Sequence, residues 1–171
     1  MNNIKFLLFL SVIICFIGCG TSHDYTKSNL NKNYFSEKII FIKIDPNSKN
    51  GISLSGMTGG QRVNQPDVKE TFKKAINELS TETNIEIKLV DSFEGINNDK
   101  NNLMFEAHIL EIDWYFGFST ATLKTVIDFK NNTKEIRANG IRKSGGGDET
   151  NNLRKSLKDV TYNFLKEIGK Q

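Results

Sequence analysis

The sequence predicts an α+β fold: a two-layer sandwich in which two helices cover one face of a mixed, mostly antiparallel five-stranded sheet, in the order β-α-β-β-β-β-α. Two observations support this fold class. Apolar residues recur with a helical period over residues 68–79 and again over 153–168. Apolar and polar residues alternate over 85–89 and 120–129, a pattern typical of strands with one buried face. We expect one domain over residues 37–171.

The first strand and the first helix have the clearest signals. Residues 39–44 read Ile-Ile-Phe-Ile-Lys-Ile and are apolar on both faces, which predicts a central strand. After a long loop, Pro66 opens a helix over 66–79, whose apolar stripe we expect to lie on the sheet. A strand at 85–89 then completes a crossover unit, so the two strands should be parallel.

Three further strands and a second helix follow. In residues 103–118 the apolar positions change parity, which predicts a β-bulge near Ile109 and Leu110. A strand over 120–129 reaches a hairpin turn at Asn131-Asn132, residue types that tolerate a positive φ, and an edge strand returns over 135–141. A glycine-rich connector at 144–147 leads to a helix that Asp148 or Thr150 caps and that extends to residue 168.

The amino-terminal segment resembles a bacterial export signal. Lys5 precedes an apolar run over 6–17, which matches a secretory signal and is too short to span a bilayer, since a spanning helix needs about 20 residues. The run ends in Phe16-Ile17-Gly18-Cys19, which resembles the lipobox of bacterial lipoproteins. The resemblance implies that residues 1–18 are a signal peptide and that Cys19 receives diacylglycerol and an amino-terminal acyl chain.

The residues after Cys19 predict a flexible tether and a location in the cell. Residues 20–36 are polar and show no hydrophobic period, so we expect 19–36 to be a lipidated, flexible tether. Gly20 is not the aspartate that retains many related lipoproteins in the inner membrane, and no acidic cluster follows it. By this resemblance the protein is expected in the cell envelope, on the outer membrane, facing the periplasm.

Cysteine usage and charge exclude several classes of function. The two cysteines are Cys15, in the signal, and Cys19, so no thiol is left for a disulfide, a zinc site or a nucleophile. The net charge of +3 indicates no nucleic-acid partner. We expect no metal and no cofactor, because His108 is the only histidine of the expected folded region.

An enzyme is the minority hypothesis. A hydrolase would need a serine nucleophile, His108 as the base, and Glu106 or Asp113 as the acid that orients His108. No serine motif is present. Residues 45–51 superficially resemble a calcium loop, but Lys49 occupies the fifth ligand position, so a plain turn is favoured. The glycines at 145–147 lack phosphate-loop spacing and precede Asp148, which favours a connector.

Aromatic residues near the end of the long strand are the candidate binding residues. We expect Trp114 and Phe116 to complete the core, with Tyr115 and Phe118 outside it on a partner-binding surface. Gln61 and Arg62, beside Gly59-Gly60, are further candidates for contact with a partner or a polar ligand. The loop over 51–65 is therefore an alternative site for a small ligand.

The order of these elements resembles a group of small outer-membrane lipoproteins. It matches the YajG type, the lipopolysaccharide-assembly lipoprotein and the amino-terminal domain of the curli-secretion lipoprotein, over residues 38–45, 66–79, 85–91, 103–141 and 153–168. Such relatives are non-enzymatic. The resemblance implies an accessory or assembly factor, anchored through Cys19, that binds an envelope protein or a lipid or glycan component. A small-ligand-binding lipoprotein and a hydrolase are the alternatives.

Overall fold

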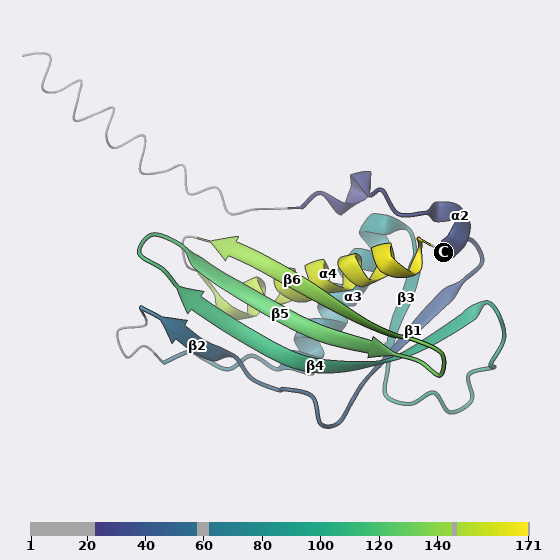
Figure 1. Ribbon diagram of the computed structural model, residues 1–171, viewed down its shortest axis with the longest axis horizontal. Helices are drawn as coiled ribbons and strands as arrows, with labels where there is room; N and C mark the ends of the chain where they lie inside the picture. Colours follow the sequence, from purple (N-terminus) through teal and green to yellow (C-terminus); the bar gives the residue numbers. More distant parts are fainter. Residues whose placement is uncertain (1–22, 58–61, 145–146, 171) are drawn as a thin grey trace, which may run out of the picture.

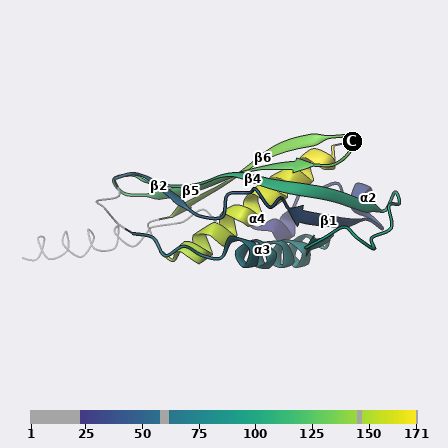
Figure 2. The ribbon, with the colours of Figure 1, turned by 90° about the horizontal axis from the view of Figure 1, so that it is seen from below.

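The computed structural model describes residues 23–57, 62–144 and 147–170, which form one mixed sheet with helices on one of its faces (Figures 1 and 2). Cys19, Gln61 and the glycines at 145–146 lie outside these residues. The strands are β1 (Ile39–Ile44), β2 (Ser53–Gly56), β3 (Glu86–Val90), β4 (Asn102–Phe116), β5 (Ala121–Lys130) and β6 (Glu135–Ser144). The helices are η1 (Tyr25–Lys27), α2 (Lys32–Phe35), α3 (Val68–Thr83) and α4 (Glu149–Ile168).

The α+β class is confirmed, but the predicted number of strands is wrong. The sheet has six strands, because β2 forms inside the expected loop and pairs in parallel with the second half of β4. The main path runs β3-β1-β4-β5-β6, so β1 is interior but not central, and the long β4 holds the middle. Three of the five strand pairings are parallel, whereas we predicted a mostly antiparallel sheet. The crossover prediction is confirmed, since β1 and β3 are parallel.

The predicted bulge lies in β4 where the apolar parity changes. The register with β5 shifts between Ile109 and Glu111, which leaves Leu110 unpaired and partly exposed. As a result Ile109 and Ile112 both face the core and are buried. The bulge therefore lets one strand of fifteen residues keep a single buried face along its length.

The β5–β6 hairpin forms where predicted but with a different turn. Asn131 donates its backbone N–H to the carbonyl oxygen of Lys134 at 2.9 Å, and its side chain accepts from the backbone N–H of Thr133 at 3.0 Å. Among the described residues only Glu37 and Asn84 are non-glycine residues with a positive φ, so this turn uses none. The asparagine side chain, acting as an Asx turn, replaces the positive φ that we predicted.

Both long helices begin at an aspartate cap and bury the predicted stripe. Asp67 and Asp148 accept from the backbone N–H groups of Glu70 and Asn151, so Pro66 precedes the cap of α3 rather than opening the helix. The predicted apolar positions of both helices are buried. Gly140 lets α4 lie close to β6. A Cβ at this position would be 2.1 Å from the carbonyl oxygen of Ser156, so a larger residue would push the helix away.

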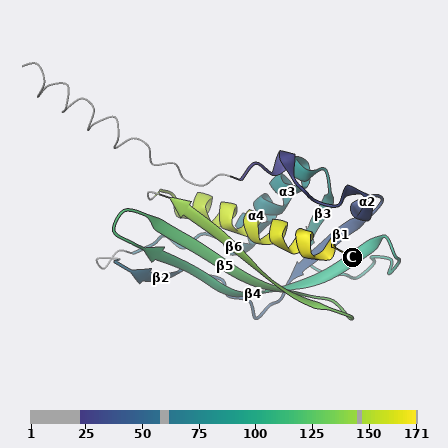
Figure 3. The same cartoon turned by 45° about the horizontal axis from the view of Figure 1, so that its top comes forward.

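The segment that we predicted to be a flexible tether is packed from residue 24 to residue 36. Tyr25, Leu30 and Phe35 are buried in the core, at 5–6% exposure. Asn31 donates its side-chain N–H to the carbonyl oxygen of Gly169, which places α2 beside the end of α4 (Figure 3). The folded domain therefore begins near residue 24, about a dozen residues earlier than predicted, and has a third, short α-helix.

Truncating Tyr25 tests this correction. Tyr25→Ala should lower the free energy of unfolding by about 3 kcal/mol, the lower end of the range for removing a buried aromatic side chain. Lys27→Ala, a change at an exposed neighbour, should leave it unchanged within about 0.5 kcal/mol. Urea unfolding followed by circular dichroism measures both. Equal midpoints for the two variants would show that this segment contributes nothing to the core.

An ion pair on the face of the sheet that the helices leave open predicts acid sensitivity. The Asp128 side chain is 8% exposed and accepts from Nε and Nη2 of Arg137, both at 2.7 Å. The hydrogen bonds from Arg137 lower the pKa of Asp128. A carboxyl whose pKa is lower in the folded state stabilises the fold above its unfolded pKa of about 3.9, and this stabilisation is lost as the pH falls through the folded value.

Asp128→Asn should therefore lower the melting temperature at pH 7, and the difference from wild type should shrink as the pH falls below about 4. Thermal melts between pH 2 and pH 7 check this expectation. A difference that stayed constant over this range would mean that the carboxylate charge contributes nothing.

Candidate functional site

One end of the sheet exposes aromatic and apolar side chains. In β4 the buried Trp114 and the half-buried Phe116 face the helices, with their rings 4.8 Å apart, as predicted. Tyr115, on the opposite face, is 51% exposed, and Phe118, in the turn to β5, is 95% exposed. The turn is closed by the backbone N–H of Gly117, which donates to the carbonyl oxygen of Thr120 at 2.9 Å.

β2 brings a third apolar side chain to this end. Met57 is 68% exposed and donates its backbone N–H to the carbonyl oxygen of Phe116 at 2.7 Å. Before it, Gly56 has a φ of +80°, and a Cβ there would lie 2.8 Å from Cε2 of Tyr115, so the tyrosine ring covers this glycine. Met57, Tyr115 and Phe118 form what we call the apolar tip.

A hollow of about 400 Å³ lies beside Phe118, on the helix side of the sheet. Its lining includes Arg62, Val63, Trp114, Phe116, Phe118 and Glu149. Nε1 of Trp114 is buried and has no hydrogen-bond partner in the described part of the chain. A buried indole N–H without an acceptor is costly, so the neighbourhood of Trp114 is not optimised for stability alone.

The structure thus brings together two of the four predicted binding residues. Arg62 and Phe118 line the same hollow, whereas Tyr115 faces the other side of the sheet. Gln61 is outside the described residues. Trp114 is in the core, as predicted, but the sequence pattern carries no sign that its N–H would lack an acceptor in the described part of the chain.

The described part of the 51–65 loop has a structural role. Gln65 accepts from the backbone N–H of Ile52 at 2.7 Å and donates to its carbonyl oxygen at 3.1 Å, as a neighbouring strand would. Ser48 similarly accepts from the backbone N–H of Ile109 at 3.0 Å. The Gln65 contacts close the loop on itself, and the Ser48 contact holds the chain before it against β4, with which β2 then pairs.

A second hollow, of about 330 Å³, opens at the carboxyl ends of the parallel strands β1 and β3. This is where ligands bind in many α/β folds. Its charged residues are largely paired: Lys69 lies 2.6 Å from Asp91, whose pKa that hydrogen bond lowers, and Lys43 lies 2.7 Å from Glu106. No local sequence signal predicts this hollow, because four separate segments of the chain line it.

His108 has the orientation that its parity predicts but not the partners of a hydrolase. It faces away from Ala107, and its Nδ1 lies 3.9 Å from a carboxylate oxygen of Asp45. No hydroxyl in the described ranges donates to it, and the nominated acid Asp113 accepts from Ser55 at 2.8 Å instead. No observation here favours the hydrolase alternative.

Residues 45–51 form the turn that the sequence favoured. The side-chain carboxylate of Asp45 accepts from the backbone N–H of Asn47 at 2.7 Å. The backbone carbonyl oxygen of Asp45 accepts from the backbone N–H of Ser48 at 3.0 Å. Within the described residues, no group of three or more histidine, cysteine or acidic side chains is placed to hold a metal ion.

Comparison with known proteins adds no functional assignment. No protein-family model matches the chain, and no curated protein does. A solved structure, the crystal structure of an uncharacterized protein, aligns with a TM-score of 0.42 at 9% identity, over 78% of this chain and 91% of that one. Among the described helices, none is both long and apolar enough to cross a membrane.

Proposed function

We propose that this chain is an envelope lipoprotein, attached through lipid on Cys19, that acts as a non-enzymatic accessory or assembly factor and binds another envelope component. The motif Phe16-Ile17-Gly18-Cys19 supports the attachment. Two or more acyl chains give stable anchoring, which a single chain does not. The proposed location is the outer membrane, facing the periplasm.

The observation that carries the binding function is the exposure of Phe118. Phe118 is 95% exposed at a turn beside the hollow that it lines, and with Tyr115 and Met57 it leaves apolar surface in contact with water. Contiguous exposed apolar surface of this kind marks interaction sites. Aromatic residues of this kind are enriched among the residues that dominate protein–protein binding. The apolar tip is therefore the proposed partner surface.

The hollow beside the tip indicates what fits there. Phe118, Phe116 and Val63 line it and favour an apolar side chain. Arg62 and Glu149 also line it and favour polar groups of opposite charge. A protein segment supplies both groups together. A lipid or glycan component is the other proposed class of partner. The small-ligand alternative is supported by the hollow at the ends of β1 and β3 rather than by contacts of the 51–65 loop.

Replacing the lipidation residue tests the anchor. In the full chain, Cys19→Ser should abolish metabolic incorporation of palmitate and shift the protein from the detergent-extracted membrane fraction to an unprocessed or released form. Fractionation followed by mass determination measures this. An unchanged lipid-anchored form would contradict the proposal.

Crosslinking in native envelopes tests the tip. The double variant Tyr115→Ala/Phe118→Ala should lose the crosslinked partner, while its melting temperature stays unchanged because both side chains are exposed. Leu110→Ala is the matched control, since Leu110 is also exposed but lies at the bulge in the middle of β4. Recovery of the same adducts at wild-type level from the double variant would count against the apolar tip.

A further inference from the structure

The side of α4 next to β6 carries a cluster of positive charge that the apolar tip does not include. Arg142 lies on β6, on the same face as Ala138 and Gly140, and so points toward α4. Lys155 on α4 lies beside it, and both line a small hollow together with His23 and Tyr25. The strand and the helix therefore bring two cations from distant parts of the sequence to one place.

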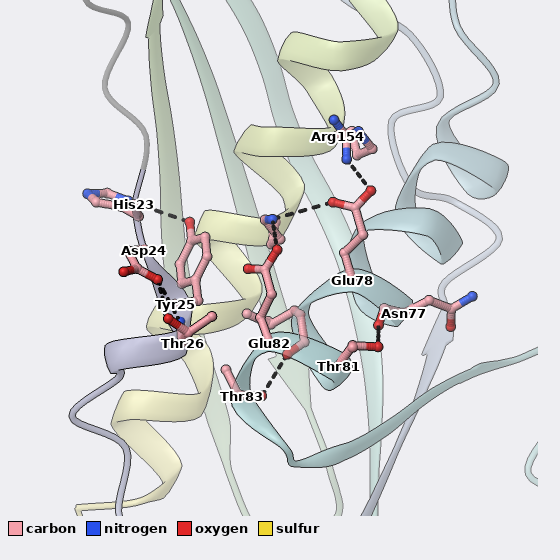
Figure 4. Close-up of polar contacts among 12 residues, drawn as sticks. His23, Asp24, Tyr25, Thr26, Asn77, Glu78, Thr81, Glu82, Thr83 and Arg154 are labelled. Carbon is pink, nitrogen blue, oxygen red and sulfur yellow. Dashed lines mark hydrogen bonds and ion pairs between the residues drawn. The ribbon is translucent and has the colours of Figure 1, made fainter.

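The neighbouring charges are already matched. Arg154 pairs with Glu78 (Figure 4). Lys158 pairs with Glu78 and with Glu82, at 3.4 and 2.8 Å. Asp159 accepts from Tyr25 and from His23, at 3.2 and 2.9 Å. The acidic groups around the hollow are thus used by other donors.

Arg142 and Lys155 have no such partners. Nε and Nη1 of Arg142 are buried without a hydrogen bond, and neither side chain forms an ion pair within the part of the chain that the structure describes. Burial lowers the pKa of Lys155, and the positive charges of Arg142, Arg154 and Lys158 act in the same direction. A buried guanidinium without an acceptor is expensive, and its planar donors match the oxygens of a phosphate.

The size of the hollow limits the ligand. Its volume is about 40 Å³. One water molecule needs roughly 10–15 Å³ of such space, so the hollow has room for a small group such as one phosphate. The ligand's remainder would extend into solvent past His23, which is exposed.

We propose that Arg142 and Lys155 bind a phosphate group, and that its source is the headgroup of an anionic phospholipid. The phosphate site stands on its own geometry, whereas the lipid source rests on the proposed attachment at Cys19. Cys19 precedes His23 by four residues, which span at most about 14 Å, so anchoring would hold the hollow within reach of the headgroups. Positive clusters at a membrane surface attract anionic lipids.

The test uses the full chain, purified in a non-ionic detergent, and titrated calorimetrically with inorganic phosphate or with short-chain phosphatidylglycerol. Wild type should bind both, and the lipid more tightly. Arg142→Gln and Lys155→Gln should each weaken binding about tenfold or more, because each removes a charge-assisted donor. Lys143→Gln, at the exposed neighbouring position, is the matched control and should bind as wild type does.

Each outcome decides a part of the proposal. Equal affinity for phosphate and phosphatidylglycerol, lost in both variants, would support the site and overturn the lipid source. Binding unaffected by either substitution, or no binding by wild type, would overturn the site. Failure of palmitate labelling would refute the anchor while leaving the phosphate titration intact. Melting curves confirm folding, and Lys155→Gln provides the decision if Arg142→Gln does not fold.

Discussion

The carboxylate of Asp159 on α4 joins three parts of the molecule: α4 itself, the free edge of β6 and the amino-terminal segment. One oxygen accepts from the backbone N–H of Ile141 on the free edge of β6, at 2.9 Å, and the other accepts from Tyr25 and His23. Burial raises the pKa of the Tyr25 hydroxyl, and the charge of Asp159 acts in the same direction, so this hydroxyl stays a donor. Nearby, Asn163 donates to the carbonyl oxygen of Asn139 on the same edge, at 2.8 Å. α4 thus supplies two of the hydrogen bonds that a further strand would supply and covers part of the free edge of β6.

The parts of the fold that were predictable are those with a repeated local signal. The apolar stripes of α3 and α4 repeat over several turns, and the change of parity at Ile109 and Leu110 has no regular strand solution, so it required a bulge. β2 could not be predicted in this way, because its four residues include two serines and a terminal glycine. Within the described residues it pairs with β4 alone, which is far along the chain. Tyr25, Leu30 and Phe35 follow at intervals of five residues, which match neither a helix nor a strand.

The residues of the candidate sites follow the same rule: those with a local sequence pattern were predictable, and the others were not. Alternation along β4 predicted that Tyr115 would be exposed when Trp114 was buried, and the structure agrees. Asp159 lies in an amphipathic helix, where an acidic residue is expected to face solvent. The sequence therefore does not indicate that Asp159 accepts hydrogen bonds from β6 and from Tyr25. Arg142 did have a usable signal: it occupies the inward parity of β6 after Ile136, Ala138 and Gly140, and a cation at an inward strand position needs a partner.

The packing of residues 24–36 changes what anchoring would do. A free tether over residues 19–36 would let the domain sample a wide shell above the membrane, because a flexible chain of that length sets only a loose distance. With Tyr25 fixed on Asp159, only the few residues between Cys19 and His23 separate the proposed anchor from the folded domain. The hollow at Arg142 and Lys155 lies at that junction. In the anchored form, the domain would be held by lipid at Cys19 and by a headgroup at the nearby hollow. Two points of attachment restrict the tilt of the domain relative to the bilayer, whereas one point does not. A partner of the apolar tip would then meet that surface at a defined orientation to the bilayer, which lowers the entropic cost of binding for a membrane-bound partner.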